Sequence, residues 1–558
     1  MYRWKNDIFS KDKYKTMRVF LGITISLFIC HIACTQPFTH RDTLRGSITP
    51  ERSWWDLKYY DLAVDFDIDK RFIKGSNTIS FDVIKSAQTM QIDLQEPLAI
   101  THVEYKGNPL NYSRNGSVYL IQFPYPLSAG TSDRLSVFYE GHPIEAGLPP
   151  WDGGITWEKD VNGEPFVASS CQGIGASTWW PCKDHMSDEV DSMLIRITTP
   201  SSLMDVSNGR LRQIEYHADG RHTYHWFVSN PINNYGVNVN IANYTHWSDT
   251  LHGEKGILDL DFYVLEDNYD KARVHFQDAY RTLRAFEYWF GPYPFYNDGY
   301  KLVEVPYLGM EHQSSVTYGN KYQMGYLGSD LSATGWGLKW DFIIVHESAH
   351  EWWANSVTYK DMADMWIHES FANYAESLFL DYHYGRNAAN EYVIGTRLRI
   401  INDKPIIGPY NVNGKGSKDM YYKGGNMLHT LRTWLNDDVL WRKVLRGLQQ
   451  EFYHQTVTTD QVETYISKAT GKDLHAFFNQ YLRDTRIPNL EMKTKGSKLS
   501  YKYSDVVEGF NMPLRILISE NESTWINPTT EWQDFKANRP VDYFRVDPNF
   551  YVEVVGSR

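Results

Sequence analysis

The sequence predicts a multidomain protein of the α+β class, with an all-β N-terminal domain, a mixed α/β central domain and a small C-terminal β domain. At 558 residues the chain is too long for a single hydrophobic core. Strand-like alternation of apolar and polar residues occupies both ends of the chain, and helical spacing occupies the middle. We therefore expect domains at residues 35–246, 247–486 and 487–558, preceded by a signal segment at residues 1–34.

The composition indicates a folded protein that does not bind nucleic acid. Hydrophobic residues make up 42% of the chain and charged residues 22%, as in globular proteins. The formal net charge of −12 argues against nucleic acid as a partner, because phosphate backbones bind basic surfaces. An acidic protein could favour cationic peptide amines, although a solvated acidic surface is the commoner explanation of such a charge.

The N-terminal segment has the features of an export signal. Basic residues precede a short apolar run from Val19 to Ala33, which is too short for a typical membrane span. The run ends at His31–Cys34, which resembles a bacterial lipobox whose cysteine is lipidated, with His31 in place of the usual Leu. We expect an exported protein, in the periplasm or attached to the membrane as a lipoprotein of a bacterial cell envelope. An uncleaved membrane anchor is the alternative.

Strand patterns predict the all-β N-terminal domain. Apolar residues alternate with acidic ones across residues 60–69, which is the period of a half-buried strand. The pattern returns at residues 79–83, 90–94 and 135–139, with Gly, Asn and Pro turns between these segments. The domain is expected to end near residues 244–246.

The central domain contains the motif His346-Glu347-Ser348-Ala349-His350. Residues four apart share one face of a helix, so His346 and His350 can direct two imidazoles at one point, as zinc requires. Glu347 then lies beside that point, where a general base for a water molecule is needed. A catalytic zinc takes three protein ligands, and Glu369, 19 positions after His350, is the candidate for the third. A surface helix with incidental histidines is the alternative reading of the motif.

A second helical pattern follows the motif. Its apolar residues have spacings of three and four and lie between Phe371 and Tyr382, and Gly385 ends it. Glu369 therefore lies near the start of a helix that can pack antiparallel to the first helix. The sequence also predicts helices at residues 268–290, 438–453, 458–469 and 473–482, with Thr458 and Gln461 in the spacing of a capping box.

The motif and its continuation resemble the gluzincin aminopeptidases, the family of aminopeptidase N and the leukotriene epoxide hydrolase. In that family 18 residues separate His-Glu-x-x-His from the third ligand, as here, and Phe-Ala-x-Tyr-x-Glu follows, which matches residues 371–376. Trp352, Asn355 and Val357–Thr358 also match. His368-Glu369-Ser370 replaces the usual Asn-Glu-Gly. The resemblance implies a thermolysin-like catalytic domain with one zinc ion per chain.

The same resemblance implies substrate-binding residues. Ser169–Gln172 resembles the segment of the β domain that reaches into the active site, which implies that Gln172 contacts the first residue of the substrate. Gly309-Met310-Glu311 resembles the family strand Gly-x-Met-Glu-Asn, in which the Glu binds the α-ammonium group. In this chain Leu308 and His312 replace the usual Gly and Asn of that strand.

Two tyrosines receive roles in the same way. Tyr421 aligns with the Tyr of the family sequence Tyr-Glu-Lys-Gly, whose hydroxyl faces the developing oxyanion, and Tyr422 is the neighbour most easily confused with it. Tyr307 precedes the substrate-binding strand, where relatives line the pocket for the first side chain.

Cys171 and Cys182 lie 11 residues apart, and a disulfide between them is allowed but not required.

These residues predict a zinc-dependent aminopeptidase acting on peptides with a free N-terminus. An endopeptidase or an epoxide hydrolase on the same scaffold, or a non-catalytic peptide-binding protein, are the alternatives. Many relatives continue into a large helical domain that covers the active site. This chain lacks that domain, so we expect a more open site.

Overall fold

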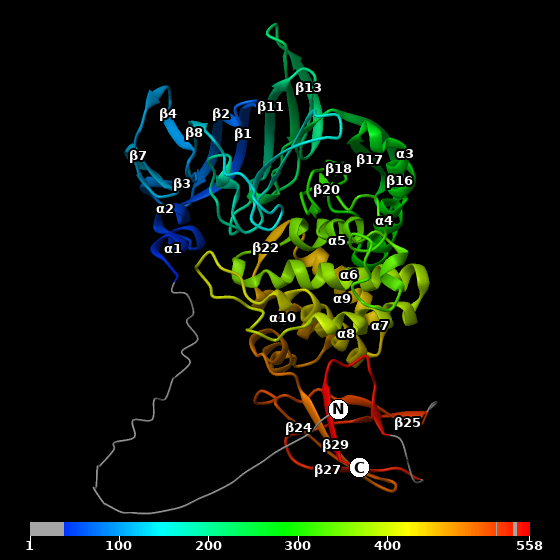
Figure 1. Cartoon of the computed structure of the whole chain (residues 1–558). Helices are drawn as coiled ribbons and strands as arrows, with labels where there is room; N and C mark the ends of the chain where they lie inside the picture. Colours follow the sequence, from blue (N-terminus) through cyan, green and yellow to red (C-terminus); the bar gives the residue numbers. More distant parts are fainter. Residues whose placement is uncertain (1–37, 520–521, 539–543, 558) are drawn as a thin grey trace, which may run out of the picture. The chain divides into compact units, whose positions relative to one another are not determined.

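The computed structural model describes residues 38–519, 522–538 and 544–557 (Figure 1). The predicted signal segment, including Cys34, lies outside these residues. Within the described residues, no helix combines the length and the apolarity that a membrane span needs.

The first part of the chain is built from β-sheets, as predicted. Its largest sheet has eight strands in the order β13-β14-β11-β1-β2-β8-β4-β5. These strands are β1 (Trp55–Asp67), β2 (Phe72–Val83), β4 (Ala99–Tyr105), β5 (Asn108–Pro109), β8 (Ser132–Gly141), β11 (Ser192–Pro200), β13 (Arg210–Tyr216) and β14 (Arg221–Val228). In β1 alternate side chains are buried, which confirms the half-buried strand expected at residues 60–69.

Two smaller sheets complete this part. One has the order β3-β7-β6 and consists of β3 (Ala87–Asp93), β6 (Asn111–Asn115) and β7 (Val118–Leu127). The other has the order β12-β15-β10-β9 and consists of β9 (Gly154–Lys159), β10 (Pro165–Ser170), β12 (Met204–Val206) and β15 (Asn240–Ala242). β10 leads directly into the segment that carries Gln172.

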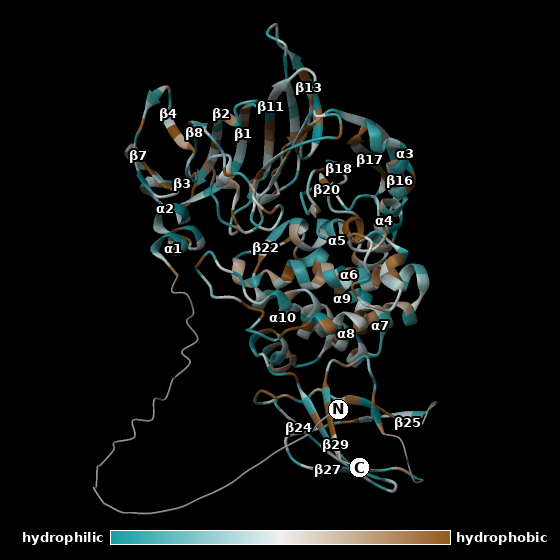
Figure 2. Cartoon of the chain, in the orientation of Figure 1, coloured by the Kyte–Doolittle hydropathy of each residue, from teal (hydrophilic) through white to brown (hydrophobic). Residues whose placement is uncertain are grey.

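Two short helices, α1 (His40–Gly46) and α2 (Pro50–Ser53), precede the first strand. No residue of α1 is buried, and the helix is mostly teal in the hydropathy colouring of Figure 2. Polar contacts rather than a hydrophobic face therefore hold it.

The central part begins with a five-stranded sheet of order β16-β17-β18-β20-β19. Its strands are β16 (Tyr244–Gly253), β17 (Gly256–Leu265), β18 (Tyr300–Glu304), β19 (Gly309–Met310) and β20 (Val316–Tyr318). β17, β18 and β20 are parallel, and β19 forms an antiparallel edge. Residue 246, the predicted end of the N-terminal domain, lies inside β16. The domain boundaries given by the sequence stay predictions.

The central part also contains helices, one of which, α5, carries His346 and Glu347. The helices are α3 (Tyr269–His275), α4 (Gln277–Phe290), α5 (Phe342–Ala349), α6 (Trp366–Tyr384), α7 (Arg386–Gly395), α8 (Tyr422–Leu435), α9 (Asp438–Glu451), α10 (Thr459–Thr470) and α11 (His475–Phe478). β21 (Val357–Tyr359) and β22 (Gln455–Val457) form a short parallel pair. The capping box of Thr458 and Gln461 is confirmed at the start of α10.

Two predicted helices are interrupted. The helix expected at residues 268–290 is broken at Phe276, which leaves helical backbone angles and buries its ring against Phe262 and Tyr318. The helix expected at residues 473–482 is α11 followed by a π-helical turn, Asn479–Arg483. Both interruptions depend on tertiary packing, which the periodicity of apolar residues does not encode.

The chain ends in two small sheets, which completes the α+β architecture that the sequence predicts. Their orders are β27-β24-β23-β29 and β26-β25-β28. The strands are β23 (Asn489–Lys495), β24 (Lys498–Ser504), β25 (Leu514–Ser519), β26 (Glu522–Ile526), β27 (Gln533–Lys536), β28 (Arg545–Val546) and β29 (Glu553–Ser557).

The buried apolar residues form two clusters. One belongs to the N-terminal β-sheets, and the other joins the central part to the C-terminal sheets. Val303, Val305, Tyr307 and Met310 come from the central sheet region but pack in the cluster of the N-terminal sheets. The edge of the central sheet is therefore part of the first hydrophobic core.

Candidate metal centre and active site

His346, His350 and Glu369 converge at the junction of α5 and α6. Asp341 caps α5 and accepts a hydrogen bond from the backbone N of Ile344 at 3.0 Å, which fixes the start of the helix. His346 lies on α5, His350 directly follows it, and Glu369 lies in the first turn of α6. The Nε2 atoms of His346 and His350 lie 3.8 and 3.6 Å from Oε2 of Glu369.

These three residues fit a zinc ion. They are the one group in the described part of the chain whose His, Cys, Asp or Glu atoms are spaced to hold a metal. Zinc bonds of about 2.0 to 2.1 Å in tetrahedral geometry place ligand atoms about 3.3 to 3.5 Å apart, close to the observed separations. Oε2 of Glu369 is buried and has no hydrogen-bond partner. A bound cation would satisfy this oxygen, whose burial without a partner is otherwise costly.

The remaining imidazole nitrogens are held by hydrogen bonds that orient both rings. Nδ1 of His346 lies 2.9 Å from Oε1 of Glu376, and Nδ1 of His350 lies 3.0 Å from the carbonyl oxygen of Trp353. Nδ1 therefore donates and Nε2 is left as the metal-binding atom. The Trp353 carbonyl is available because α5 passes into a π-helical turn at Glu351–Ser356, where the backbone leaves regular helical geometry.

The sequence did not predict that Glu376 orients His346. It indicated Glu376 only as the last residue of the Phe-Ala-x-Tyr-x-Glu match at residues 371–376. Glu376 also accepts hydrogen bonds from Asn373 at 3.0 Å and from the hydroxyl of Tyr392 at 2.6 Å. The available signal was its position seven residues after Glu369, because residues two turns apart lie on one face of a helix.

Glu347 lies beside the metal ligands, against the edge strand β19. Burial, together with the charges of Glu369 and Glu376, raises the pKa of Glu347 to about 7. A Cβ atom at Gly309 would lie 2.5 Å from a methyl carbon of Ile343 and 3.4 Å from Cγ of Glu347. Glycine at position 309 therefore allows β19 to approach α5 closely, and Met310 follows it on the same buried edge.

Gln172 joins the β domain to the metal site. Its Nε2 atom donates to Oε1 of Glu311 at 2.5 Å and to Oε1 of Glu369 at 2.9 Å. The hydroxyl of Tyr235 donates to the same Glu311 oxygen at 3.2 Å. Burial and the nearby Glu369 and Glu347 raise the pKa of Glu311 to about 8, so this carboxylate would be stabilised by a positive charge.

Tyr421 faces this group of carboxylates from the start of α8. Its ring centroid lies 6.1 Å from that of His346. Burial raises the pKa of Tyr421 well above its usual value, with further contributions from Glu369, Glu311 and Glu347. Burial and Glu376 raise the pKa of Tyr422, which therefore has different carboxylate neighbours. The structure thus places Tyr421, and not Tyr422, beside the ligands.

Tyr307 is buried next to the segment that carries Gln172. Its hydroxyl donates to the carbonyl oxygen of Ser169 at 2.7 Å. This contact ties the central sheet region to β10, and a role of Tyr307 in the pocket for the first side chain stays a prediction.

His368 and His312, two of the residues that depart from the family pattern, are buried in polar contacts. His368 accepts a hydrogen bond from the backbone N of Tyr359 at 2.9 Å. His312 lies 3.4 Å from the hydroxyl of Thr317, and burial lowers its pKa to about 3, so it is neutral. Cys171 and Cys182 are both buried free thiols, so the disulfide that the sequence allowed is not formed.

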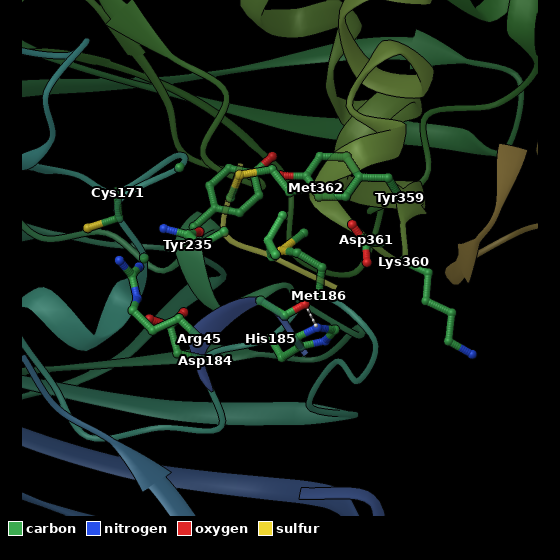
Figure 3. Close-up of a pocket in the computed structure, with 15 residues that line it drawn as sticks. Arg45, Cys171, Asp184, His185, Met186, Tyr235, Tyr359, Lys360, Asp361 and Met362 are labelled. Carbon is green, nitrogen blue, oxygen red and sulfur yellow. Dashed lines mark hydrogen bonds between the residues drawn. The ribbon is translucent and has the colours of Figure 1, made fainter. Parts of the chain in front are cut away.

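A cavity of about 50 Å³ lies beside the turn that carries Gln172 (Figure 3). Cys171 and Gly173, which flank Gln172, line it together with Tyr235. Arg45 of α1 lines the same cavity and donates a hydrogen bond to the carbonyl of Ile174 in this turn. The N-terminal segment thus contacts the part of the β domain that reaches the metal site.

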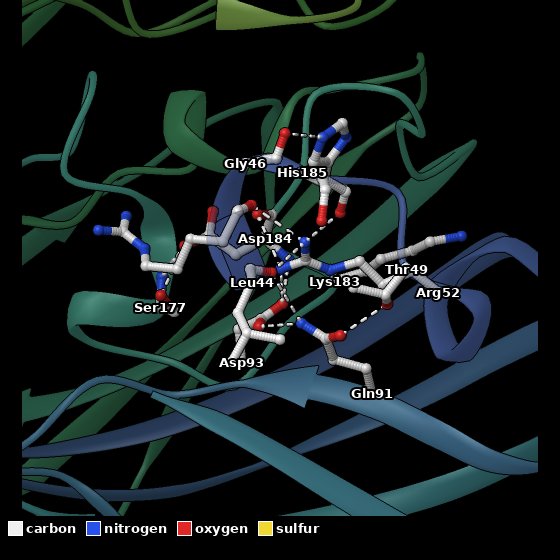
Figure 4. A network of polar contacts seen from close by, with 12 residues as sticks. Leu44, Gly46, Thr49, Arg52, Gln91, Asp93, Ser177, Lys183, Asp184 and His185 are labelled. Carbon is white, nitrogen blue, oxygen red and sulfur yellow. Dashed lines mark hydrogen bonds and ion pairs between the residues drawn. The ribbon is translucent and has the colours of Figure 1, made fainter. Parts of the chain in front are cut away.

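A buried arginine holds this N-terminal segment in place (Figure 4). Arg52 donates hydrogen bonds to Asp93 at 2.7 Å and to three backbone carbonyls around the end of α1, those of Leu44, Arg45 and Ser47. Asp93 also accepts from the backbone N of Asp184, another residue of the cavity wall, at 3.0 Å.

Two family models match the parts of the chain that carry the residues of this site. The model of the peptidase M1 N-terminal domain matches residues 57–235, and the model of the peptidase family M1 domain matches residues 274–481. The chain belongs to the M1 peptidase family. M1 peptidases are zinc-dependent, in agreement with the three residues that fit the ion here.

Similar M1 proteins include leucyl aminopeptidase of Saccharolobus solfataricus, 20% identical over 455 residues, which are 79% of this chain and 55% of that protein. Aminopeptidase N of Lactobacillus helveticus is 22% identical over 465 residues, which are 77% of this chain and 51% of that protein. The chain spans about half the length of these curated relatives.

The fold is shared with a crystal structure of an M1 zinc metallopeptidase from Deinococcus radiodurans. The TM-score is 0.65 at 20% identity, and the match covers 79% of this chain and 98% of that one. A similar structure, which covers 78% of this chain with a TM-score of 0.65, is described as a two-domain M1 zinc metallopeptidase bound to L-tryptophan.

Proposed function

We propose that this protein is a zinc-dependent aminopeptidase that releases single N-terminal residues from peptides. The observation that carries the proposal is the contact of Gln172 with both Glu311 and the metal ligand Glu369. It brings a carboxylate suited to bind an ammonium group next to the residues that hold zinc. The aminopeptidase names of similar M1 proteins support the same activity.

Zinc held by His346, His350 and Glu369 would polarise the scissile carbonyl and make a water molecule more acidic. Glu347 takes the proton of the attacking water and delivers it to the leaving amine. Its pKa of about 7 suits this exchange, because a catalytic base works best when its pKa lies near the working pH.

Tyr421 stabilises the negative oxygen of the tetrahedral intermediate by donating its phenolic hydrogen. The pKa of Tyr421 is well above its usual value, so the hydroxyl keeps its proton at neutral pH. A donor in such a position contributes about 3 to 4 kcal/mol to the transition state in other enzymes.

Glu311 and Gln172 select the end of the peptide. Glu311 is 4% exposed, and its pKa of about 8 shows that its negative charge is poorly stabilised without a partner. An α-ammonium group supplies the missing positive charge. A peptide that continued past this point would bring no charge and would leave the carboxylate unpaired, which disfavours cleavage of internal bonds.

A panel of aminoacyl chromogenic substrates tests the proposal. Activity should disappear with a chelator and return with zinc, and N-acetylated substrates should be poor. Endopeptidase activity predicts similar rates on free and acetylated peptides, and a non-catalytic peptide-binding protein predicts binding without turnover. Epoxide hydrolysis has no specific residue in its favour.

We also propose that the protein is exported and attached to a bacterial cell envelope through a lipid on Cys34. The basic and apolar residues of the segment before Cys34 support this proposal. Mass spectrometry of the mature N-terminus should find a diacylglyceryl group on Cys34. An intact, unmodified segment in a soluble cell fraction would contradict the proposal.

A further inference from the structure

Ser370 connects the helix that carries the third metal ligand to the segment that carries Tyr421. The residue is fully buried, and its hydroxyl donates to the carbonyl oxygen of Met420 at 2.6 Å. Ser370 directly follows the ligand Glu369, and Met420 directly precedes Tyr421. This hydrogen bond therefore links the residue after the metal ligand Glu369 to the residue before Tyr421.

The surroundings of Ser370 are shaped to accept its hydroxyl. A Cβ atom at Gly424 would lie 1.9 Å from Oγ of Ser370, and a Cβ atom at Gly425 would lie 2.3 Å from Oδ1 of Asn373. The two glycines let the first turn of α8 rest directly on α6. The space left by the missing side chain at position 424 is occupied by the hydroxyl of Ser370.

The backbone at Tyr421 is held on both sides. Its φ and ψ angles of −77° and −84° are not helical, and its carbonyl accepts a hydrogen bond from the backbone N of Gly425 at 2.8 Å. The preceding carbonyl, of Met420, is held by Ser370. The peptide group between Met420 and Tyr421 is planar, so fixing the Met420 carbonyl fixes the N–Cα bond of Tyr421. The hydrogen bond from Gly425 to the Tyr421 carbonyl restrains rotation about that bond, and together the two contacts set the direction in which the Tyr421 side chain leaves the backbone.

We propose that Ser370 is a positioning residue that aims the Tyr421 hydroxyl at the carbonyl oxygen of the substrate. The inference rests on the proposed function. Ser370 does not touch the substrate, and its effect is transmitted entirely through Tyr421. Loss of the hydroxyl should misplace a group that acts in the transition state and leave ground-state binding intact.

The test is a double-mutant cycle of Ser370→Ala and Tyr421→Phe in the zinc-loaded enzyme. Ser370→Ala should lower kcat about tenfold with KM changed less than about twofold. In the Tyr421→Phe background the same change should have no further effect, because residues that act as one unit are not additive. Ser370→Gly also lacks the hydroxyl and should match Ser370→Ala.

Ser377→Ala is the matched control. Ser377 lies on the same helix, is 2% exposed, and its hydroxyl has no hydrogen-bond partner. This variant should keep the kcat of the wild type. A second measurement uses a phosphinic pseudopeptide, whose tetrahedral phosphinyl oxygens represent the oxyanion. Ser370→Ala should weaken its binding about tenfold, as it weakens turnover, while elemental analysis finds unchanged zinc content.

Three results would overturn the inference. They are a wild-type kcat in Ser370→Ala, multiplicative effects of the two substitutions, and a loss of zinc that would place the effect on Glu369 instead. Failure of the proposed function is a different outcome, because the wild-type enzyme would then cleave no aminoacyl substrate.

Discussion

Gln172 follows β10 and Glu311 follows β19, two strands of different sheets, and their side chains meet at 2.5 Å beside the candidate metal ligands. The amide of Gln172 also contacts Glu369, but through Oε1, so Oε2 of Glu369 is left for the metal. In the proposed function, recognition of the substrate N-terminus and metal binding therefore share one hydrogen-bonded group.

Glu311→Gln should reduce the preference for a free N-terminus. Wild type should cleave a free-amine peptide on the order of 10²-fold faster, in kcat/KM, than its N-acetylated counterpart, because only the free amine pairs with the carboxylate. The variant should lose activity on the free amine and narrow this gap. Glu304→Gln is the control, since Glu304 is also buried but bonds to the backbone N of Leu265 and to Asn268. If the wild type cleaved both peptides at similar rates, Glu311 would not be the residue that binds the α-ammonium group.

Glu347→Gln should separate catalysis from metal binding. We expect unchanged zinc content and a kcat lower by a factor of about 10² to 10⁴, because the variant lacks the base. His350→Ala should instead carry little zinc, because two ligands rarely hold a catalytic ion. Elemental analysis and steady-state kinetics distinguish the two variants. Stoichiometric zinc in His350→Ala would contradict the assignment of the ligands.

Tyr421→Phe should lower kcat by about 10² to 10³ with little change in KM, as expected for an oxyanion donor. Tyr422→Phe is the internal control and should behave nearly as wild type. The two substitutions remove the same atom from adjacent residues, so steady-state kinetics on one substrate compares them directly. A larger loss of kcat in Tyr422→Phe than in Tyr421→Phe would show that Tyr422, and not Tyr421, is the oxyanion donor.

Glu376→Gln should weaken zinc binding by about 10 to 100-fold, because the hydrogen bond that orients His346 loses its charge. Competition with a chelator of known affinity measures this change without any need for turnover. Glu463→Gln is the control, since Glu463 is a buried carboxylate that pairs with Arg483 on another surface of the domain. Equal zinc affinity of the two variants would exclude the orienting role.

Arg52→Met should destabilise the folded protein by about 3 to 5 kcal/mol, because Asp93 is then left as a buried and unpaired charge. Both side chains are 1% exposed, so water cannot replace the lost partner. Combining Arg52→Met with Asp93→Asn should recover part of this loss. Urea unfolding at neutral pH measures the free energy of unfolding. If the double variant is no more stable than Arg52→Met, the buried charge is not the cause.

The predictability of the structure differs from residue to residue. The strand at residues 60–69 was evident because alternating burial produces an alternating sequence, and the metal site because two histidines four apart share a helix face. The break at Phe276 and the π-helical turn after α5 were not evident, since each depends on contacts with distant residues. The contact of Gln172 with Glu369 spans 197 positions, so the periodicity of the sequence contains no information about it, and only the resemblance of Ser169–Gln172 to a family segment pointed to the active site.

The N-terminal core includes residues of the central sheet region, so the two parts of the protein depend on each other for their packing. Among these residues are Val303, Val305, Tyr307 and Met310. The edge strand β19, which leads directly into Glu311, is therefore supported by the N-terminal β-sheets. A fragment that contains the zinc motif alone would keep the three candidate ligands but lose Gln172, which belongs to the proposed peptide site. Recombination between relatives at the border of the two parts would separate Gln172 from Glu311, so productive chimeras should keep residues 54–311 from a single parent.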